Sequence, residues 1–337
     1  MPEMVTEDEA MRRAIALAAR GLGTTSPNPV VGCLLLTAEG EIVGEGFHAY
    51  AGGPHAEIVA LAQAGERARG GTAIVTLEPC NHTGRTGPCS QALISAGIKR
   101  VVIAVDDPTP VATGGSHTLR AAGVQVETGV RRREAEQGNV AWLTAVRRSR
   151  PYLIWKFAAT LDGRSAAADG TSQWITSAPA RTDVHELRST VDAIIAGVGT
   201  VIADDPQLTV RTPAQARVRD AAAPTWIATA ADVGAGPDGR VDLAALMARL
   251  YARGIRAALL EGGPTLAGAF LSAGLVDQVI GYVAPKLLGD GKSALVGAGV
   301  HTIAEAIELD LTDIAQVGPD LRFTASLRPK PSDRPAH

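Results

Sequence analysis

The sequence predicts an α/β protein with two domains. Its 337 residues exceed the roughly 100–200 residues of one ordinary domain. Strand-like and helix-like segments alternate through the first 149 residues, which is typical of a layered α/β sandwich. At Ser149-Arg150-Pro151 a helical stretch stops before a proline and a new β pattern begins. We therefore expect one domain over residues 1–149 and a second over residues 150–337.

The first domain should open with an amphipathic helix. Thr6-Glu7-Asp8-Glu9 is a capping-box pattern, which marks a helix start, and Gly21 is suited to end the helix. Apolar runs separated by turn residues predict the elements that follow. These are strands over Val30–Leu36 and Glu41–His48, a helix from His55, a strand over Thr72–Leu77, a helix over Ser90–Ala96, a strand over Arg100–Val105, a helix over His117–Ala122, a strand over Val124–Glu127 and one terminal helix over Arg131–Arg148.

The second domain begins with a β pattern at Pro151. Further strands are predicted over Asp192–Ala196, Thr225–Thr229 and Ile255–Leu260, and the last runs into two glycines and a helix. Glycines at such a point let backbone N–H groups approach a pyrophosphate. The segment Gly234–Gly239 matches the dinucleotide fingerprint literally, but it contains Pro-Asp-Gly, a turn signal, so we interpret it as a surface loop.

Composition and charge disfavour several classes of function. Apolar residues make up 46% of the chain, without an uninterrupted run long enough to span a membrane. The formal charge of −3 argues against general affinity for nucleic-acid backbones. The polar N-terminus lacks a signal-peptide pattern, so a cytoplasmic location is expected. Three cysteines are an odd number, so no disulfide framework is expected, and mid-strand Cys33 is interpreted as a small buried apolar residue.

One stretch carries the residues of a metal site. His55 stands at the start of an apolar helical segment, Cys80 follows a strand in Glu-Pro-Cys, and Cys89 follows in Gly-Pro-Cys. One imidazole and two thiolates are a ligand set that a catalytic zinc takes, with its fourth position kept for water. Pro54 and Pro88 suit the first turns of helices, whose N-termini favour thiolates. We therefore predict a zinc ion ligated by His55, Cys80 and Cys89.

Glu57 distinguishes a catalytic site from a closed structural one. It stands two residues after His55, where it can shuttle a proton of the zinc-bound water without binding the metal. No fourth Cys or His stands at ligand spacing. The order of His-x-Glu, strand and Pro-Cys matches the zinc-deaminase signature, although eight residues separate the two cysteines where two are usual. These residues predict a deaminase.

The long spacer and an upstream turn carry a family resemblance. Residues 79–89 (Pro-Cys-Asn-His-Thr-Gly-Arg-Thr-Gly-Pro-Cys) and residues 25–33 (Thr-Ser-Pro-Asn-Pro-Val-Val-Gly-Cys) resemble the bifunctional riboflavin-biosynthesis deaminase–reductases. The resemblance continues through 151–163, 172–176, 192–200, 203–211 and 260–266. It implies a cytidine-deaminase-like three-layer fold for residues 1–149 and a dihydrofolate-reductase-like fold for residues 150–337.

The chain departs from the family pattern at two places that bear on the sites. Thr109 stands where the family usually has Asn, and a Gly-rich run after this turn also differs somewhat. The segment after Arg211 is short and polar, so that either this member is shortened or a segment is missing from the sequence. The second departure bears on the sheet order of the reductase half.

The resemblance also implies site residues in both halves. The deaminase pocket would be lined by Asn28, His48, His82, Arg85 and Asp107. The Asn and Asp side chains would form hydrogen bonds with the amide groups of the pyrimidine ring, and the His and Arg side chains would bind the phosphate. The reductase substrate would be held by Lys156, Ser172, Arg188, Leu208, Arg211 and Glu261. The cofactor NADPH would be held by Ala158, Trp174, Thr200, Asp204, Gly263, Pro264, Thr265, Leu266, Ala267, Gly268 and Ala269.

The implied function is two successive reactions of riboflavin biosynthesis. Zinc-dependent deamination of 2,5-diamino-6-ribosylamino-4(3H)-pyrimidinone 5′-phosphate would be followed by NADPH-dependent reduction of the ribosyl group, giving 5-amino-6-(5-phosphoribitylamino)uracil. The expected partner is thus a small pyrimidine ribose phosphate, neither nucleic acid nor membrane, and self-association stays open. Two alternative functions are considered. The first is a nucleic-acid deaminase with an unrelated second domain, which the long cysteine spacer and the negative net charge disfavour. The second is a zinc-stabilised binding module without catalysis, in which Glu57 would have no function.

Overall fold

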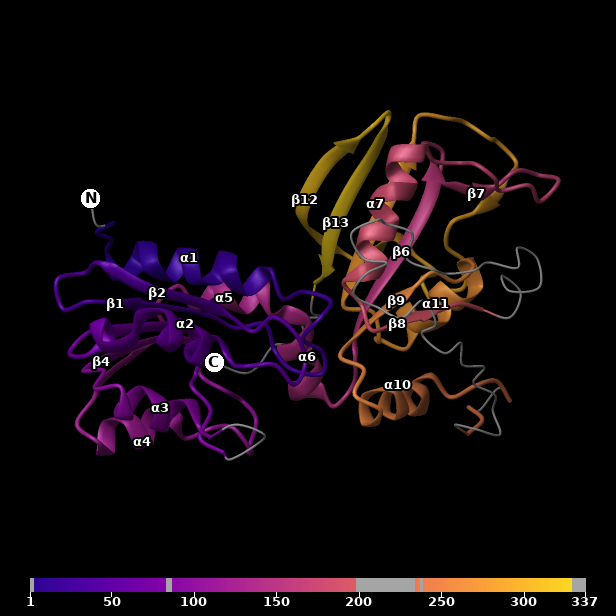
Figure 1. Cartoon of the computed structure of the whole chain (residues 1–337). Coiled ribbons are helices and arrows are strands. Elements are labelled where there is room, and N and C mark those ends of the chain that lie inside the picture. The colour runs from indigo at the N-terminus through magenta and orange to yellow at the C-terminus, as the bar shows by residue number, and fades with distance from the viewer. Residues whose placement is uncertain (1–2, 83–86, 198–233, 237–238, 329–337) are drawn as a thin grey trace. The chain divides into compact units, whose positions relative to one another are not determined.

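The chain forms two compact units, Met1–Ser149 and Arg150–His337, in the computed structural model (Figure 1). The structure describes residues 3–82, 87–197, 234–236 and 239–328. Within these ranges, no helix combines the length and the apolar character needed to cross a bilayer.

A five-stranded sheet in the order β2-β1-β3-β4-β5 runs through the first unit. β1 pairs antiparallel with both β2 and β3, whereas β3, β4 and β5 are parallel to one another. Their bounds are β1 Gly32–Leu36, β2 Ile42–Phe47, β3 Thr72–Leu77, β4 Arg100–Val105 and β5 Gln125–Thr128. The carboxyl ends of β3 and β4 therefore lie side by side at one edge, where the loops after Leu77 and Val105 begin.

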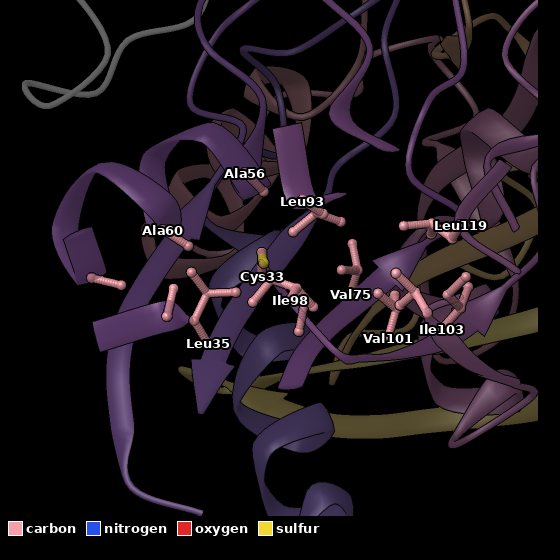
Figure 2. Close-up of a cluster of buried hydrophobic side chains, with 14 of the residues drawn as sticks. Cys33, Leu35, Ala56, Ala60, Val75, Leu93, Ile98, Val101, Ile103 and Leu119 are labelled. Carbon is pink, nitrogen blue, oxygen red and sulfur yellow. The ribbon is translucent and has the colours of Figure 1, made fainter. Parts of the chain in front are cut away.

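Helices cover both faces of this sheet, because side chains alternate along its strands. Cys33 and Leu35 lie in a core with α2, α3 and α4 (Figure 2). Leu34 and Leu36 lie in a second core with α1, α5 and α6, the helices labelled in Figure 1. Cys33 is fully buried, as the sequence predicted. The helices are α1 Glu7–Ala19, α2 Ala56–Ala64 followed by η1 Gly65–Ala68, α3 Cys89–Ser95, α4 Gly115–Ala121, α5 Arg132–Gly138 and α6 Val140–Arg148.

Two features of the first unit follow from short-range contacts. The predicted capping box is confirmed, since Thr6 caps α1 and exchanges hydrogen bonds with Glu9. Gly46 on β2 lets α2 approach closely, because a Cβ at this position would lie 2.2 Å from the Ala56 carbonyl oxygen. The start of α2 is therefore held directly against the sheet.

The single terminal helix predicted over Arg131–Arg148 is wrong. The segment forms α5 and α6, which are interrupted at Asn139 (φ −120°, ψ 19°). The Asn139 side chain accepts from the Val30 backbone N–H at 3.3 Å and donates to the Val30 carbonyl at 3.2 Å. Because this pair satisfies buried backbone groups just before β1, the contact with Val30 fixes the break between the helices.

The second unit is built on a six-stranded sheet in the order β12-β13-β10-β6-β9-β8. β10, β6, β9 and β8 are parallel, and β13 is antiparallel to both β10 and β12. The strands are β6 Tyr152–Thr160, β8 Ala193–Ile195, β9 Ala257–Leu260, β10 Gln278–Ala284, β12 Leu309–Val317 and β13 Asp320–Leu327, with a separate pair of β7 Arg164–Ala166 and β11 Lys292–Ser293.

Helices α10 (Leu243–Ala252) and α11 (Pro264–Ser272) pack in one hydrophobic core against β6, β9 and β10. Helix α7 (Ala178–Ser189) is tied to Tyr282 of β10 through Asp183, and the short 3-10 helix η2 spans Ile303–Glu305. The strands predicted over Asp192–Ala196 and Ile255–Leu260 are present as β8 and β9. The predicted strand over Thr225–Thr229 lies outside the described residues.

The literal dinucleotide fingerprint at Gly234–Gly239 does not open a helix. Ala235 pairs with Val241 in an isolated antiparallel bridge, and the Gly239 N–H donates to the Gly236 carbonyl across the turn. Helix α10 begins only at Leu243, after Asp242 as its N-cap. Interpretation of this segment as a loop is therefore confirmed for the residues that the structure describes.

Two candidate active sites

His55, Cys80 and Cys89 bring three metal-ligand atoms together in the first unit. Their donor atoms all lie within 4.8 Å of one another. His55 Nδ1 is 3.2 Å from Cys89 Sγ and 3.5 Å from Cys80 Sγ. Tetrahedral zinc, with usual bond lengths to nitrogen and sulfur, separates such donors by about 3.5 Å. The three residues therefore fit a zinc ion, and the cluster is the one such group within the described parts of the chain.

Each ligand is placed by the end of a regular element. His55 is the N-cap of α2, Cys80 lies in the loop after β3, and Cys89 is the first residue of α3. The expectation that both prolines occupy first helical turns is wrong, because Pro88 is the N-cap of α3 and Pro54 precedes the N-cap of α2. Cys89 alone of the two cysteines begins a helix.

The ligand cluster already favours one thiolate through its own hydrogen bonds. The side-chain hydrogen bond with Cys89 lowers the pKa of Cys80 to about 4, and the bond with His55 acts in the same direction. The same Cys80–Cys89 bond raises the pKa of Cys89. The hydrogen bond with Cys80 raises the pKa of His55 as well. Cys80, in the loop after β3, is therefore more acidic than Cys89.

Glu57 lies in the first turn of α2, next to the cluster. Its side chain is 3% exposed and forms a hydrogen bond with Cys89. Burial raises the pKa of Glu57, so its carboxylate is a stronger base than an exposed one. A buried carboxylate beside a metal-bound water can accept and return a proton, which is the function predicted from the sequence.

His48 and Asn28 form a hydrogen-bonded pair close to the ligands. The His48 ring lies 5.5 Å, centroid to centroid, from the His55 ring. Nδ1 of His48 is 3.0 Å from the Pro54 carbonyl, which can only accept, so Nδ1 carries the proton and Nε2 accepts from Asn28 Nδ2 at 3.2 Å. Burial lowers the pKa of His48, which agrees with a neutral ring. Because both ring nitrogens are engaged, His48 as arranged here orients Asn28 and has no donor left for a phosphate.

Asp107 follows β4 and is 8% exposed. Its Oδ1 accepts from the Thr109 backbone N–H at 2.7 Å and from Thr109 Oγ1 at 2.6 Å. Burial raises its pKa. The backbone N–H of Asp107 donates to Glu78, which precedes the Pro79-Cys80 pair.

The remaining predicted deaminase residues lie on the cysteine spacer. His82 is half-buried and its Nδ1 is enclosed without a hydrogen-bond partner among the described residues. Arg85 lies outside the described residues.

The sequence motif Glu78-Pro79-Cys80 predicted a role for the cysteine but none for Glu78. A carboxylate directly after the apolar strand β3 was the signal that could have identified it, since buried acids at such points need hydrogen-bond donors. The role of Asn139, predicted to lie in a continuous helix, had no local signal, because its partner Val30 is distant in the sequence.

The second unit holds a buried ion cluster formed by the middle of β6, the last turn of α7 and the residue after β9. Glu261, directly after β9, accepts from Arg188 Nε at 2.6 Å and from Nη2 at 2.9 Å, and lies 3.7 Å from Lys156 Nζ. All three side chains are at most 16% exposed. Burial lowers the pKa of Lys156. Burial opposes ionisation of Glu261, but the bond from Arg188 and the charge of Lys156 outweigh it, so the pKa of Glu261 is lowered.

Three other predicted reductase residues lie on β6 and in the loop after β7. Ala158 is on β6 and pairs in register with Tyr282 of β10. Ser172 is half-buried in the loop after β7, and Trp174 is 62% exposed in the same loop. The Arg181 guanidinium lies 4.3 Å from the Trp174 ring centroid, and Lys286 donates to the Trp174 carbonyl at 2.8 Å.

The predicted cofactor turn forms the start of α11. Gly263 is the N-cap, and Pro264 is the first helical residue, followed by Thr265 and Leu266. Ala267 and Gly268 are buried, and a Cβ at Gly268 would lie 1.9 Å from the Val296 carbonyl oxygen. Ala269 is half-buried on the helix. The accessible part of this turn is therefore its first residues, because the later ones pack inside the protein.

Four predicted residues of the second site lie outside the described residues. They are the cofactor contacts Thr200 and Asp204 and the substrate contacts Leu208 and Arg211.

Two protein families match the chain. The cytidine and deoxycytidylate deaminase zinc-binding region matches residues 4–105, and the RibD C-terminal domain matches residues 151–219 and 209–323. The second match comes in two pieces that overlap over residues 209–219, around Arg211.

Several relatives match both units together. The riboflavin biosynthesis protein RibD of Escherichia coli is 44% identical, covering 92% of this chain and 96% of the relative. The protein of the same name from Mycobacterium tuberculosis is 45% identical, covering 95% and 97%. Among solved structures, Acinetobacter baumannii RibD superposes with a TM-score of 0.85 at 40% identity, covering 96% of this chain and 99% of that one. The Thermotoga maritima diaminohydroxyphosphoribosylaminopyrimidine deaminase/5-amino-6-(5-phosphoribosylamino)uracil reductase gives 0.83 at 32% identity, with the same coverage.

Proposed function

The chain belongs to the RibD family of riboflavin biosynthesis, and from this premise we propose which of its residues perform each of the family's two reactions. The protein is a bifunctional enzyme, a hydrolase that deaminates the pyrimidine and an oxidoreductase that reduces the ribosyl group. Its cofactors are zinc and NADPH. The deaminase is assigned to Met1–Ser149 and the reductase to Arg150–His337.

In the deaminase, His55, Cys80 and Cys89 would hold zinc, and Glu57 would be the catalytic residue. Zinc, when bound, lowers the pKa of water to about 7 and so supplies the nucleophile at neutral pH. Glu57 accepts the proton of the attacking water and delivers it to the departing amino nitrogen, so that ammonia leaves and a carbonyl remains. Its burial supports this assignment, because a raised pKa suits a group that must both take and give a proton near neutrality.

Asn28 and Asp107 would recognise the pyrimidine. With Nδ2 bound to His48, Asn28 keeps its carbonyl oxygen to accept from the substrate. Asp107 keeps Oδ2, to which none of the described residues donates. His82 and Arg85 would meet the ribose phosphate, as the family resemblance implies. His48 is assigned to positioning Asn28 instead of contacting the phosphate.

In the reductase, NADPH would transfer hydride to C1′ of the ribosyl group, giving the ribityl chain. Lys156, Arg188 and Glu261 would bind this substrate together with Ser172, Leu208 and Arg211. The Lys156–Glu261–Arg188 cluster supports this assignment, because it places two cationic side chains, of the kind that bind a phosphorylated sugar, in one buried position.

NADPH would lie against the start of α11. Gly263, Thr265 and Leu266 can present backbone N–H groups to its pyrophosphate, since helical hydrogen bonding begins only when Ala267 donates to Gly263. Pro264, between them, has no N–H to offer. Ala158, Trp174, Thr200 and Asp204 complete the proposed cofactor contacts, and Ala267, Gly268 and Ala269 support the turn from within the helix.

The observation that carries the proposal is the His55–Cys80–Cys89 cluster with buried Glu57 beside it. We expect the purified protein to release ammonia from the diaminopyrimidine ribose phosphate without NADPH, and to oxidise NADPH only when the deaminated product is present. Ammonia release should disappear after zinc is removed with a chelator and return when zinc is added. NADPH oxidation on the supplied diamino substrate, with no ammonia released, would contradict the proposed order.

A cytoplasmic location and self-association stay predictions. Three free cysteines, of which two are proposed zinc ligands, support a reducing compartment, because oxidation would destroy the ligand set.

A further inference from the structure

Glu78 is a buried acid whose carboxylate is shared by two loops. It directly follows β3, its side chain is 7% exposed, and its backbone N–H donates to the Val105 carbonyl at 2.9 Å. Its Oε2 accepts from the Asp107 backbone N–H at 3.1 Å, and its Oε1 accepts from the Ser116 backbone N–H at 2.8 Å. One carboxylate thus fixes both ends of the segment that follows β4.

The segment that follows β4 also contacts the two residues that flank Cys80. Asn81 donates its backbone N–H to the Ala112 carbonyl at 3.2 Å. Gly115 allows the close approach, since a Cβ there would lie 1.8 Å from the Pro79 carbonyl oxygen. Backbone contacts of Pro79 and Asn81, the residues on either side of Cys80, therefore hold Cys80 close to the segment that follows β4.

The Asp107 carboxylate is held from a second direction by Thr109. The backbone N–H and the hydroxyl of Thr109 both donate to Oδ1 of Asp107, at 2.7 and 2.6 Å. No donor to Oδ2 is found in the described part of the chain. The Asp107 carboxylate is more than nine-tenths buried, and only one of its oxygens accepts hydrogen bonds from the described residues. A buried charged oxygen without a hydrogen-bond donor is unfavourable, so Oδ2 is suited to accept a hydrogen bond from a ligand.

We propose that Glu78 and Thr109 are positioning residues for the deaminase substrate: Glu78 fixes the backbone of Asp107, Thr109 fixes its carboxylate, and Oδ2 is left to accept from a pyrimidine N–H group. This inference rests on the proposed deaminase function. Asp107 would form the hydrogen bond with the substrate, whereas Glu78 and Thr109 would only hold Asp107 in position.

Glu78→Gln tests whether Glu78 positions the backbone of Asp107. An amide of the same shape can accept from one backbone N–H but places its own NH₂ against the other, so Asp107 or Ser116 is released. Losing a hydrogen bond to a charged group typically changes an equilibrium about ten- to a hundredfold, so KM for the diaminopyrimidine phosphate should rise within that range. The kcat should change much less, because the lost interaction serves binding of ground state and transition state alike. Zinc content should stay at that of the wild type.

Thr109→Val tests whether Thr109 positions the carboxylate of Asp107, and it remains informative if the Glu78 variant does not fold. Valine keeps the shape of threonine and the backbone N–H but removes the hydroxyl donor, so KM should rise with zinc content unchanged. Thr109→Ser restores the donor and should restore KM. Glu66→Gln, at an exposed acid paired only with Arg69, is the matched control and should behave as wild type.

A double-mutant cycle with Asp107→Asn separates positioning from general stability. If Glu78 acts through Asp107, adding Glu78→Gln to Asp107→Asn should raise KM little further. An unchanged KM in both single variants, or full additivity in the cycle, would overturn the inference. Zinc content, together with a urea unfolding curve of each variant, reports whether the first unit is folded. Absence of ammonia release by the wild-type protein would instead refute the proposed deaminase function itself, so the two failures are distinguishable.

Discussion

At the scale of single residues, the metal site assigns different roles to three chemically identical side chains. Cys80 and Cys89 lie with His55 in the ligand cluster, whereas Cys33 is in the hydrophobic core and burial raises its pKa well above the ordinary value. We predict one zinc per chain in the wild type and in Cys33→Ser. Cys80→Ser and Cys89→Ser should each lose most of the zinc, because two ligands do not hold a tetrahedral ion well.

Metal analysis of the four proteins after extensive dialysis checks this prediction. Full retention of zinc in both Cys80→Ser and Cys89→Ser would show that the ligand set is wrong. Loss of zinc from Cys33→Ser alone would show that a different cysteine is the ligand.

Residue-level chemistry was predictable from the sequence where the residues form a local motif. The types and order of His55, Cys80 and Cys89 predicted one ligand set, and the structure brings their donor atoms within 4.8 Å of one another. Their roles, and that of Glu57, stay predictions. The neutral state of His48 and the sharing of Glu78 between two loops were not predictable. Both depend on backbone groups of Pro54, Asp107 and Ser116, whose positions only the fold determines.

At the scale of elements, local signals predicted the start of α1 and the span of β3, but long-range contacts decided where the terminal helix breaks. Arg131–Arg148 has a continuous helical pattern, and its interruption at Asn139 comes from a partner 109 residues earlier in the chain. Sequence windows hold no information about such a partner. The break is therefore a tertiary feature.

Asn139→Ala should destabilise the first unit. The change leaves the buried N–H and carbonyl of Val30 without their side-chain partner, and each such group costs about 1–3 kcal/mol. We expect the free energy of unfolding of this unit to fall by about 2 kcal/mol or more in urea titrations. Gln137→Ala, at an exposed position of α5, is the control and should change it little. Equal stability of both variants would mean that the Asn139–Val30 pair is dispensable.

The start of α11 can be tested without loss of fold. Gly263 has φ −64° and ψ 168°, a conformation open to any residue, so Gly263→Val should not strain the backbone. Its side chain should block approach of a pyrophosphate and weaken NADPH binding at least tenfold in a fluorescence titration. Gly236→Val, in the loop that only resembles a dinucleotide fingerprint, should bind NADPH normally. The reverse ranking would move the cofactor site to that loop.

At the scale of the whole molecule, each reaction has its site in a unit with its own core, so the reactions should be separable by mutation. Glu57→Gln keeps the shape of the side chain but removes the proton shuttle, which typically contributes ~10²–10⁴-fold. That variant should bind zinc, release ammonia slower by this factor, and still oxidise NADPH with the supplied deaminated product. Lys156→Ala should show the opposite pattern.

Parallel assays of ammonia release and NADPH oxidation check both variants. If folded Glu57→Gln protein also failed to reduce the supplied product, the assignment of one reaction to each unit would be wrong. Glu136→Gln, at a surface position of α5, should leave both rates unchanged.

The contact between Asn139 and Val30 also determines where the gene can be divided. A fragment that stops before Asn139 would lose the residue that satisfies Val30, two positions after Asn28, and would lose α6 from the core. A fragment that stops at Ser149 keeps both. Two separate genes, one coding for residues 1–149 and the other for residues 150–337, should therefore support riboflavin synthesis when expressed together in a riboflavin auxotroph. The same experiment with the first gene cut after codon 138 should leave the auxotroph dependent on added riboflavin.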